Sequence, residues 1–592
     1  MNIYEYDVMN CIVKEGYTNQ RIVAEVTNYS LGKVNGVIQK LIEEQYLNNE
    51  FFLTEKAYKE INMKKPKNAI ILAAGFGMRM VPINSEVPKG LLEVHSESLI
   101  ERVICQLHEV GIFDIDIVVG FLKDKYEYLI DKYGVNLVYN PDYSIKNNIH
   151  SLKLAADKIS NTYIIPSDIW AEKNPFSNQE LYSWYSVSDV IDNDSSVRVN
   201  RQRELISIEE GKGGNTMIGI SYLLEEQASI VRNNIKDLCK DTSNDHLFWE
   251  EALFDEESKM IIYGRVYKSN EVVEINTYEQ LREMDDNSNN LDSDIISIIA
   301  KEIEVEVKNI QEITVLKKGM TNRSFRFSAN DKQYIMRIPG EGTEQLIDRE
   351  NEYKVYQEIK AINISDDVIY MSPENGYKIT GFLENARTCD PFNTGDVRLC
   401  MQRLRDFHDK RLSVPHTFDP YERIDFYESL WEGKSSIFRD YLDTKNKIME
   451  LKSIIDSLPK DWVLTHIDAV PDNFLFVDKE IRLIDWEYAG MQDPHLDIAM
   501  FAIYAMYDRE HVEALIDSYF TEGCSAEIRM KIYCYIAVCG LVWSNWCEYK
   551  RFCGVEFGEY SLRQYRYAKD YFKIVQEKVA KIEPAERKGM KR

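Results

Sequence analysis

The spacing of apolar residues divides the chain into three blocks. Residues 1–65 carry apolar side chains at helical spacing in three short stretches, and a fourth stretch has two asparagines at its tip, as a turn between two strands would. These stretches are Tyr6–Val13, Ile22–Val26, Leu31–Ile42 and Tyr46–Thr54. We therefore expect a small module of three helices and a hairpin, followed by a linker at Pro66.

In the second block, residues 66–286, the apolar residues form continuous runs. The run AIILAAGFG at residues 69–77 ends in glycines, a helical pattern follows at Ser98–Val110, and IDIVVG begins the next run at residue 115. Strands that are apolar on both faces and alternate with helices are typical of a doubly wound parallel sheet. We predict a Rossmann-like α/β domain here.

The third block, residues 291–592, begins within the polar run MDDNSNNLDSD, which is expected to be a linker. A helix at Ile295–Ile303 precedes strands around a glycine turn, at Val315–Phe327 and Gln333–Ile338, and the remainder is helical and rich in aromatic residues. The pattern predicts an α+β domain, so the chain as a whole is multidomain, α/β and α+β.

Composition narrows the classes of function. A length of 592 residues indicates at least two domains, because single cores rarely exceed about 250–300 residues. The net charge of −26 disfavours nucleic acid and anionic membranes as partners, because phosphate contacts need Lys and Arg. No apolar run approaches the roughly 20 residues of a membrane-spanning helix, and the start MNIYEYDVMN is unlike a signal peptide. The ten scattered cysteines predict reduced thiols in a cytoplasmic protein.

A phosphate-binding loop is predicted at residues 70–89, IILAAGFGMRMVPINSEVPK. Gly75 and Gly77 let backbone N–H groups approach a triphosphate, while Arg79 and Lys89 supply positive charge. The string contains neither a GxxxxGK[ST] loop nor the third glycine of the dinucleotide-binding fingerprint. The alternative is a tight turn between a strand and a helix.

The whole string, with Pro82 and Pro88 in register, resembles the signature of sugar-nucleotide and related nucleotidyltransferases. Further segments, YNPDYSIKNNIHSLKLA, YIIPSDIW, FWEEAL and VVEINT, are similar to parts of bacterial phosphocholine cytidylyltransferases. The resemblance implies catalytic roles for Arg79 and Lys89, a Mg²⁺ ligand at Asp168, and a second metal ligand or an ammonium contact at Asn276 and Glu250. The implied nucleotide contacts are Ala73, Ala74, Gly75, Gly77, Asn147, Asn148 and Ser151.

This block departs from the family where the relatives have a tryptophan that stacks on choline. The chain has Ser195 and Ser196 there instead. Candidates for the aromatic contact are Trp170, Tyr143, Tyr222 and Trp249.

A second motif lies at residues 464–487, LTHIDAVPDNFLFVDKEIRLIDWE. Phosphoryl transfer needs a carboxylate that orients the attacking hydroxyl, and an Asn and an Asp that hold Mg²⁺ on the phosphates. Asp468, Asn473 and Asp485 have this order and spacing. The alternative is a pair of polar β-turns.

This motif resembles the core of the kinase-like phosphotransferases, which include choline kinases and aminoglycoside phosphotransferases. Similarity to bacterial choline kinases extends over residues 295–592 and includes GMTN and RIPGEGT. It implies a phosphate-covering turn in LKKGMTNRSFRF with Asn322 near the nucleotide. It also implies that Arg337 contacts the phosphates, that Glu352 is the ion-pair partner of Arg337, and that Asp497 braces the catalytic loop.

Two tryptophans, Trp543 and Trp546, stand three residues apart on one face of a predicted helix. A quaternary ammonium has no proton to donate and is bound by aromatic faces. Spacing alone favours a core stripe, but the resemblance to the C-terminal segment of choline kinases implies an aromatic cage with Tyr560. Glu487 is the candidate for an added negative charge.

Residues 1–65 resemble a winged helix-turn-helix, including the ending LTEKAYKEI. A transcription factor is therefore the competing class of function. However, acidic residues outnumber basic ones over residues 1–60, and the expected recognition helix, Ser30–Gln45, has only Lys33 and Lys40 as bases. We predict a packing, regulatory or dimerising module that does not read DNA, and the oligomeric state stays open.

Together the resemblances imply a bifunctional transferase with small-molecule substrates. It would phosphorylate choline with ATP and transfer CMP from CTP to phosphocholine, with Mg²⁺ as the cofactor. Two alternatives stay open: ethanolamine or another amino-alcohol as the substrate, and an antibiotic-type phosphotransferase fused to a sugar nucleotidyltransferase. A phosphonate is disfavoured as the substrate, because it needs no kinase.

Overall fold

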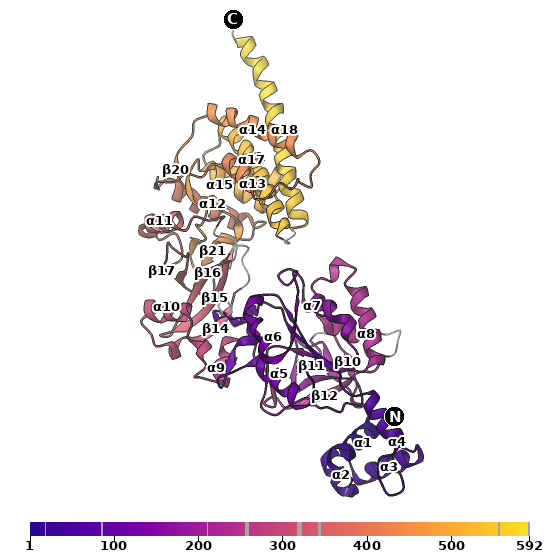
Figure 1. The fold of residues 1–592 in the computed structure, drawn as a ribbon. Helices are drawn as coiled ribbons and strands as arrows, with labels where there is room; N and C mark the ends of the chain where they lie inside the picture. Colours follow the sequence, from indigo (N-terminus) through magenta and orange to yellow (C-terminus); the bar gives the residue numbers. More distant parts are fainter. Residues whose placement is uncertain are drawn as a thin grey trace. The chain divides into compact units, whose positions relative to one another are not determined.

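The computed structural model describes residues 1–17, 19–83, 87–209, 211–254, 260–316, 322–340, 345–553 and 557–589. It divides into two compact units, Met1–Ile298 and Ile299–Arg592 (Figure 1). Over the described ranges, no helix is both long enough and apolar enough to cross a membrane. All ten cysteines are free thiols.

The first unit begins with a module of four helices. Asn2 caps the first helix in a capping box with Glu5, which satisfies backbone N–H groups that the helix leaves unpaired. The three predicted helices are present, and the predicted hairpin is reduced to one β-bridge, Leu47 to Leu53, before a fourth helix. The helices are α1 (Ile3–Glu15), α2 (Gln20–Thr27), α3 (Leu31–Glu43) and α4 (Glu55–Met63).

A seven-stranded sheet with the order β12-β8-β11-β6-β1-β4-β5 forms the centre of this unit. Strand β1 pairs in parallel with β4 and β6, and β4 with β5, whereas β11 is antiparallel to β6 and β8. The strands are β1 (Asn68–Ala73), β4 (Ile115–Val119), β5 (Asn136–Tyr139), β6 (Thr162–Pro166), β8 (Trp184–Asp192), β11 (Gly214–Leu223) and β12 (Tyr263–Tyr267). The doubly wound fold predicted from the apolar runs is confirmed.

Helices cover both faces of the sheet. Neighbouring side chains of a strand point to opposite faces, so a strand of continuous apolar residues needs a covering layer on each side. Ile71 belongs to the core that α5 (Leu99–Glu109) and α6 (Tyr128–Tyr133) complete. Ile70 belongs to the core completed by α7 (Asn148–Ala155) and α8 (Glu225–Leu238). The carboxyl ends of parallel strands β1 and β6 share one edge, where ligands bind in sheets of this type.

Short elements complete the first unit around this edge. The segment Met284–Asp294, expected to be a linker, is hydrogen-bonded to the rest of the unit: Asp285 accepts from the backbone of His95 (2.7 Å) and Asn290 from that of Glu93 (2.7 Å). The short elements are β2 (Glu93–Val94), β3 (Glu97–Ser98), β7 (Ile169–Ala171), β9 (Val197–Val199), β10 (Leu205–Ser207), β13 (Val272–Glu274) and α9 (Tyr278–Met284).

The second unit starts with an antiparallel sheet of the order β14-β15-β16-β18-β17, beside α11 (Arg349–Ile359). Its strands are β14 (Gln311–Val315), β15 (Asn322–Ala329), β16 (Lys332–Pro339), β17 (Val368–Met371) and β18 (Lys378–Gly381). The boundary between the two units falls inside α10 (Asp294–Ile303).

The remainder of the second unit is largely helical, and Figure 1 shows these helices gathered at one end of the unit. The longest buried helix is α17 (Ala526–Phe552), whose middle is surrounded by other helices and is therefore apolar on all sides. The other helices are α12 (Thr394–His408), α13 (Pro420–Ser429), α14 (Tyr441–Ser457), α15 (His495–Tyr504), α16 (Arg509–Tyr519) and α18 (Glu559–Gly589). Short strands between them are β19 (Arg387–Thr388), β20 (Val463–Thr465), β21 (Phe474–Val477), β22 (Glu480–Leu483) and β23 (Gly490–Gln492).

Candidate active sites

The first unit contains a cavity of about 470 Å³ at the carboxyl ends of β1 and β6. Most of the residues that the sequence predicts for the first site line it. They are Ala73, Ala74, Gly75, Gly77, Arg79, Lys89, Asn148, Ser151, Asp168, Glu250 and Asn276.

Lys89 joins the predicted catalytic and metal-binding residues. Its ammonium group forms an ion pair with Asp168 and donates a hydrogen bond to Asn276 Oδ1 (2.6 Å). Arg79 donates to the same oxygen (3.2 Å). The second carboxylate oxygen of Asp168, Oδ1, is buried without a hydrogen-bond partner. Because a buried, unpaired carboxylate oxygen is unfavourable, this atom fits a position for a bound cation.

Glu250 lines the same cavity and is partly buried. Burial raises its pKa to about 7, although the Tyr185 hydroxyl donates to Oε1 (3.0 Å) and favours the charged form. Its other oxygen, Oε2, has no hydrogen-bond partner. Glu274 on β13 also lines the cavity, and its pKa is raised by burial and by the Asp168 carboxylate. These carboxylates would favour a cationic substrate group.

Some of the residues predicted for the first site lie outside this cavity. Asn147 is the N-cap of α7, and its side-chain amide donates to the His246 carbonyl (2.8 Å), so it orients the helix that carries Asn148 and Ser151. Of the four aromatic candidates, only Trp249 lines the cavity. Trp170 packs under Arg102, Tyr143 against Phe76 and Phe121, and Tyr222 donates its hydroxyl to the Lys64 carbonyl.

The second unit has its own cavity, of about 510 Å³, between the sheet and the helices. The residues predicted for the second site line it, except Glu352 and Asp497. The lining residues include Asn322, Arg337, Asp468, Asn473, Asp485, Glu487, Trp543, Trp546 and Tyr560.

The loop that carries Asp468 is held from behind by Asp497, as the resemblance implied. Asp497 accepts hydrogen bonds from the backbone of His466 (3.0 Å) and Ile467 (2.7 Å), and from His408 Nε2 (3.0 Å). Burial lowers the pKa of His466 to about 4, so the ring is neutral, and its Nε2 donates to the Ile484 carbonyl (2.9 Å). This histidine therefore ties the loop to the residue before Asp485.

Acidic side chains gather where the sequence predicts Mg²⁺. The Asn473 amide donates to the backbone carbonyl (2.8 Å) and the carboxylate (3.2 Å) of Asp468. Burial, followed by the charge of Glu487, raises the pKa of Asp468 to about 7 and that of Asp485 well above its usual range. Asp485 also has a φ of 66°, in the left-handed region that Asp tolerates better than most residues. Carboxyl groups that raise one another's pKa in a buried site fit a divalent cation.

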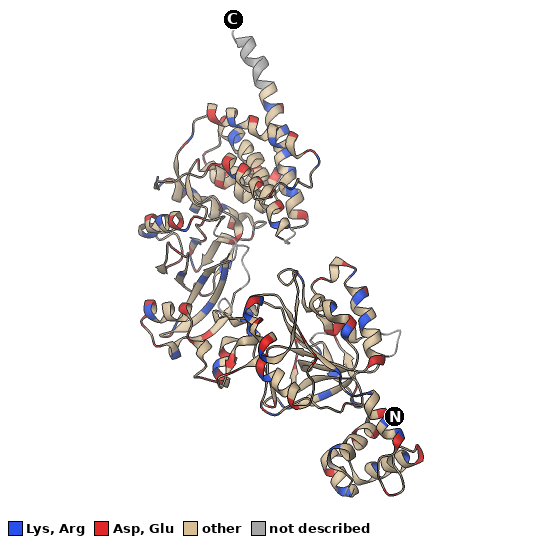
Figure 2. Cartoon of the chain, in the orientation of Figure 1, with Lys and Arg blue, Asp and Glu red and all other residues tan. Residues whose placement is uncertain are grey.

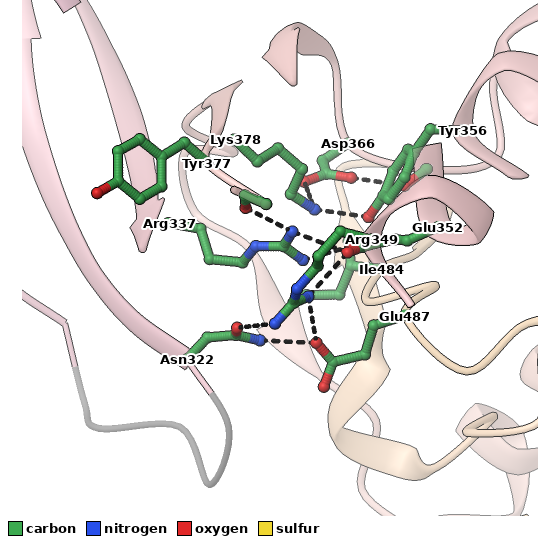
Figure 3. A network of polar contacts seen from close by, with 12 residues as sticks. Asn322, Arg337, Arg349, Glu352, Tyr356, Asp366, Tyr377, Lys378, Ile484 and Glu487 are labelled. Carbon is green, nitrogen blue, oxygen red and sulfur yellow. Dashed lines mark hydrogen bonds and ion pairs between the residues drawn. The ribbon is translucent and has the colours of Figure 1, made fainter. Parts of the chain in front are cut away.

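Arg337 on β16 is paired with Glu352 of α11 (Figure 3), and Glu352 itself does not line the cavity. The guanidinium forms a two-pronged contact with this carboxylate and donates to the Gly376 carbonyl (3.0 Å). Burial opposes the charge of Glu352, but Arg337 outweighs it and lowers the glutamate pKa to about 2. Arg337 Nε is buried without a partner, so it is available to a phosphate oxygen.

The predicted aromatic cage lies on α17 and at the start of α18. The ring centroids of Trp543 and Trp546 are 5.7 Å apart at 70°, and Tyr488 meets Trp543 edge-on. Both tryptophans are more than nine-tenths buried, and both line the cavity together with Tyr560. They are therefore part of the helical core as well as of the cavity wall.

Parts of the predicted phosphate-covering turn are not described. Residues 317–321 of LKKGMTN, and residues 341–343 of RIPGEGT, lie outside the described residues.

Sequence reasoning missed several cavity residues in both units. In the second unit these include Lys378, which lies opposite Arg337 on the neighbouring strand and contacts Asp366, and Tyr504, which donates to Asp472 (2.6 Å). Lys378 belongs to no recognisable motif, and its position depends on strand register. Glu274 could have been found, because it precedes Asn276 by two residues in VVEINT.

These folds and cavities define a nucleotidyltransferase joined to a kinase-like phosphotransferase. Residues 69–170 match the MobA-like NTP transferase domain, and residues 313–522 match choline/ethanolamine kinase. One relative of the first part is a choline-phosphate cytidylyltransferase of Streptococcus pneumoniae, which is 33% identical over 37% of this chain and 96% of its own length. Another is a 2-aminoethylphosphonate cytidylyltransferase of Lancefieldella rimae, which is 30% identical over 37% of this chain and 92% of its own length. The chain belongs to the choline-phosphate cytidylyltransferase family, and its second part carries a match to the choline/ethanolamine kinase domain.

Relatives of the second part include Protein LicA of Haemophilus influenzae, which is 28% identical over 44% of this chain and 78% of its own length. The crystal structure of choline kinase LicA from Streptococcus pneumoniae is 28% identical, with a TM-score of 0.42, over 47% of this chain and 99% of that chain.

Proposed function

We propose that the chain phosphorylates choline with ATP at the second site and transfers CMP from CTP to the resulting phosphocholine at the first, giving CDP-choline and pyrophosphate. One observation carries this proposal: the two enzyme families present on one chain catalyse consecutive steps. The kinase makes a phosphomonoester, which is the nucleophile that a cytidylyltransferase needs. This logic favours choline over a phosphonate as the starting compound.

In the kinase reaction, the substrate hydroxyl attacks the γ-phosphorus of ATP and ADP leaves. Asp468 orients this hydroxyl and receives its proton. Arg337, held by Glu352, presents its free Nε–H to the phosphates, with Asn322 beside the nucleotide. Trp543, Trp546 and Tyr560 would receive the quaternary ammonium, and Glu487 would add negative charge.

In the cytidylyltransferase reaction, a phosphate oxygen of phosphocholine attacks the α-phosphorus of CTP and pyrophosphate leaves. The glycine-rich loop after β1 and the start of α7 cradle the nucleotide. Arg79 and Lys89 offset the negative charge that develops on the phosphates. Glu250 and Glu274 would attract the ammonium group.

Both reactions call for Mg²⁺, and the residues present fit it. Within the described residues, no group of three or more His, Cys, Asp or Glu side chains could hold a metal. Mg²⁺ sites commonly use one or two protein ligands together with substrate phosphates. Asp168 with Asn276, and Asp485 with Asn473, would hold the ion at the two sites. Mg²⁺ bound by these residues would supply positive charge against the phosphates.

The N-terminal module is proposed to be structural or regulatory. Figure 2 shows both signs of charge on it, and its core is continuous with the sheet core of the first unit. Binding isotherms of the full chain with duplex DNA at low and moderate salt would test this proposal, and tight, salt-sensitive binding would contradict it. We also propose that the protein acts in the reducing cytoplasm, and the free thiols support this proposal.

The deciding experiment incubates the purified chain with ATP, CTP, Mg²⁺ and one candidate substrate at a time, followed by mass spectrometry. Choline should give CDP-choline only when ATP is present, whereas phosphocholine should give it without ATP. A better yield from ethanolamine would change the substrate assigned here, and efficient ATP-independent use of 2-aminoethylphosphonate would remove the link between the two steps. Phosphorylation of an aminoglycoside in preference to choline would favour an antibiotic-type phosphotransferase.

A further inference from the structure

Arg349, the first residue of α11, lies at the centre of a buried polar network (Figure 3). Its guanidinium donates to Glu352 Oε2 (2.8 Å), to Glu487 Oε2 (3.1 Å) and to Asn322 Oδ1 (3.3 Å). The amide of Asn322 in turn donates to Glu487 Oε2 (3.0 Å). Arg349, Asn322 and Glu487 therefore form a closed triangle, with Glu352 as a link to Arg337.

This triangle joins the antiparallel sheet of the kinase domain to its helical part. Asn322 begins β15 in the sheet, next to the segment predicted to cover the phosphates. Glu487 follows the proposed metal ligand Asp485 by two residues in the helical part. Arg349 thus links Asn322 in the sheet to Glu487 in the helical part.

The local structure leaves space for this arginine. Gly376 has a φ of 71°, and a Cβ atom at this position would lie 2.7 Å from Arg349 Cδ and 2.8 Å from Arg349 Nε. The side chain is only 9% exposed. A planar guanidinium reaches three acceptors in fixed directions, which a lysine ammonium on a flexible stem does not reproduce.

Charge explains why the contact matters to Glu487. The carboxylates of Asp468, Asp485 and Glu487 line one cavity, and an unpaired buried charge is strongly unfavourable. Arg349 lies against Glu487 and balances its charge. Glu487 Oε2 accepts hydrogen bonds from both Arg349 and Asn322, so donors of the protein itself hold this carboxylate.

We propose that Arg349 is a positioning residue of the kinase reaction, which acts through Glu487 to hold the Asp485 segment in register with the nucleotide-binding sheet. The proposal rests on the kinase function proposed above and adds to it a residue that does not touch the reacting atoms. It also gives Glu487 a task distinct from contact with the ammonium group.

The test compares Arg349→Gln, Arg349→Lys, Glu487→Gln and the double variant Arg349→Gln/Glu487→Gln in the full chain. ADP release is measured with varied choline and varied ATP. Arg411→Gln is the matched control, because Arg411 pairs with Asp461 on the surface of the same unit. CMP transfer to phosphocholine by each variant confirms equal amounts of active protein.

We expect Arg349→Gln to lower kcat by about 10- to 100-fold, because small displacements of reacting groups have effects of this size. The KM for choline should change by less than about twofold. Arg349→Lys should be intermediate. The double variant should be no slower than Arg349→Gln alone, because residues that act as one unit are not additive.

Three results would overturn the proposal. The first is a kcat for Arg349→Gln within about twofold of the control, even with a lowered melting temperature. The second is a double variant whose loss equals the product of the two single losses. The third is a raised KM for choline at unchanged kcat in Glu487→Gln, which would make Glu487 an ammonium contact instead.

These outcomes are separate from failure of the proposed function. The unmodified chain tests that function by its turnover of choline. If another alcohol is the true substrate, the kcat of each variant relative to the unmodified chain is measured with that alcohol. ATP hydrolysis without an alcohol provides a second readout.

Discussion

Asp7, in the first helix, accepts a hydrogen bond from Arg203, which lies 196 residues further along the chain between β9 and β10. The same carboxylate also accepts from the hydroxyl groups of Tyr29 and Tyr182, the latter at 3.1 Å. One acidic side chain of the N-terminal module thus receives two donors from the nucleotidyltransferase domain. Nearby, Tyr182 leads into β8, which carries the cavity residue Tyr185.

Replacement of Asp7 should therefore loosen the first unit. Asp7→Ala leaves Arg203 and Tyr182 without their shared acceptor, and a loss of this kind costs about 1–3 kcal/mol of unfolding free energy. Denaturant unfolding of Asp7→Ala, Arg203→Ala and the double variant checks this. Asp157→Asn, which affects an exposed ion pair with Lys236, is the control and should change the free energy by less than about 0.5 kcal/mol. Strict additivity in the double variant would show that the pair is not coupled.

The kinase site should be separable from the other site. Asp468→Asn keeps the side-chain size but removes the carboxylate that orients the hydroxyl, so phosphorylation of choline should fall by a factor of about 100 or more. CMP transfer to added phosphocholine should stay at the unmodified rate, because its cavity is lined by residues of the other unit. Loss of both activities in a folded variant would contradict two independent sites.

The reverse pattern is expected for Lys89→Ala. This change removes the cation that contacts Asp168 and Asn276 and is proposed to offset phosphate charge, so CDP-choline formation should fall by about 100-fold or more. Phosphocholine should then accumulate from choline and ATP, as measured by mass spectrometry. CDP-choline made at the unmodified rate would refute the assignment of this site.

The affinity of the first site for phosphocholine should depend on pH through Glu250. Burial raises the pKa of Glu250 to about 7, so below pH 7 the carboxyl is protonated and no longer attracts a cation. The KM for phosphocholine should therefore rise as the pH falls through 7. Tyr185→Phe removes a hydrogen bond that favours the charged form, so the transition should move to higher pH.

Glu250→Gln provides the reference for this experiment, because ionisation of the substrate affects the KM of this variant and of the unmodified chain equally. Its KM should be high at all pH values, and the ratio of the two KM values should titrate near pH 7. A constant ratio would exclude Glu250 from ammonium binding.

The aromatic cage can be tested without a large cavity in the core. Trp543→Leu and Trp546→Leu retain most of the apolar volume but remove the aromatic face, which is worth up to about 2 kcal/mol to a desolvated cation. The KM for choline should rise by about 10-fold or more, and the KM for ATP should change little. Ethanolamine should lose less, because its ammonium can still donate hydrogen bonds. Trp462→Leu, at an exposed site in the same unit, is the control. Equal rises in the KM values for choline, ethanolamine and ATP would show that the two tryptophans are purely structural.

The sequence predicted the parts of both sites that are local in the chain. The glycine loop with Lys89, and the run from Asp468 to Asp485, are each contained in about two dozen residues, so their chemistry can be read from order and spacing. The same holds for the helices of the N-terminal module, whose apolar periodicity is fulfilled by buried residues such as Val34 and Leu41.

Features that depend on packing between distant segments were not predictable. Lys378 belongs to no motif, and Arg349 stands in the segment DRENEY, from which only Glu352 was assigned a role. Both residues enter the network because α11 and β18 pack beside Arg337. Asn147 and Asn148 are neighbours in the sequence, but one caps α7 and the other faces the cavity. The segment around Asp285 is polar like a linker, yet its side chains find backbone partners that only the fold brings near.

The occurrence of both cavities on one polypeptide has a consequence for flux. Two separate enzymes can be made in different amounts, so a cell can adjust their ratio. Here each molecule carries both the proposed kinase cavity and the proposed cytidylyltransferase cavity, which fixes their ratio at synthesis. The steady level of phosphocholine must then be set by the rate constants of the two sites and by the supply of ATP and CTP. A mutation that slows only the first unit would therefore raise phosphocholine in proportion, and extra expression of the whole chain would not restore the balance.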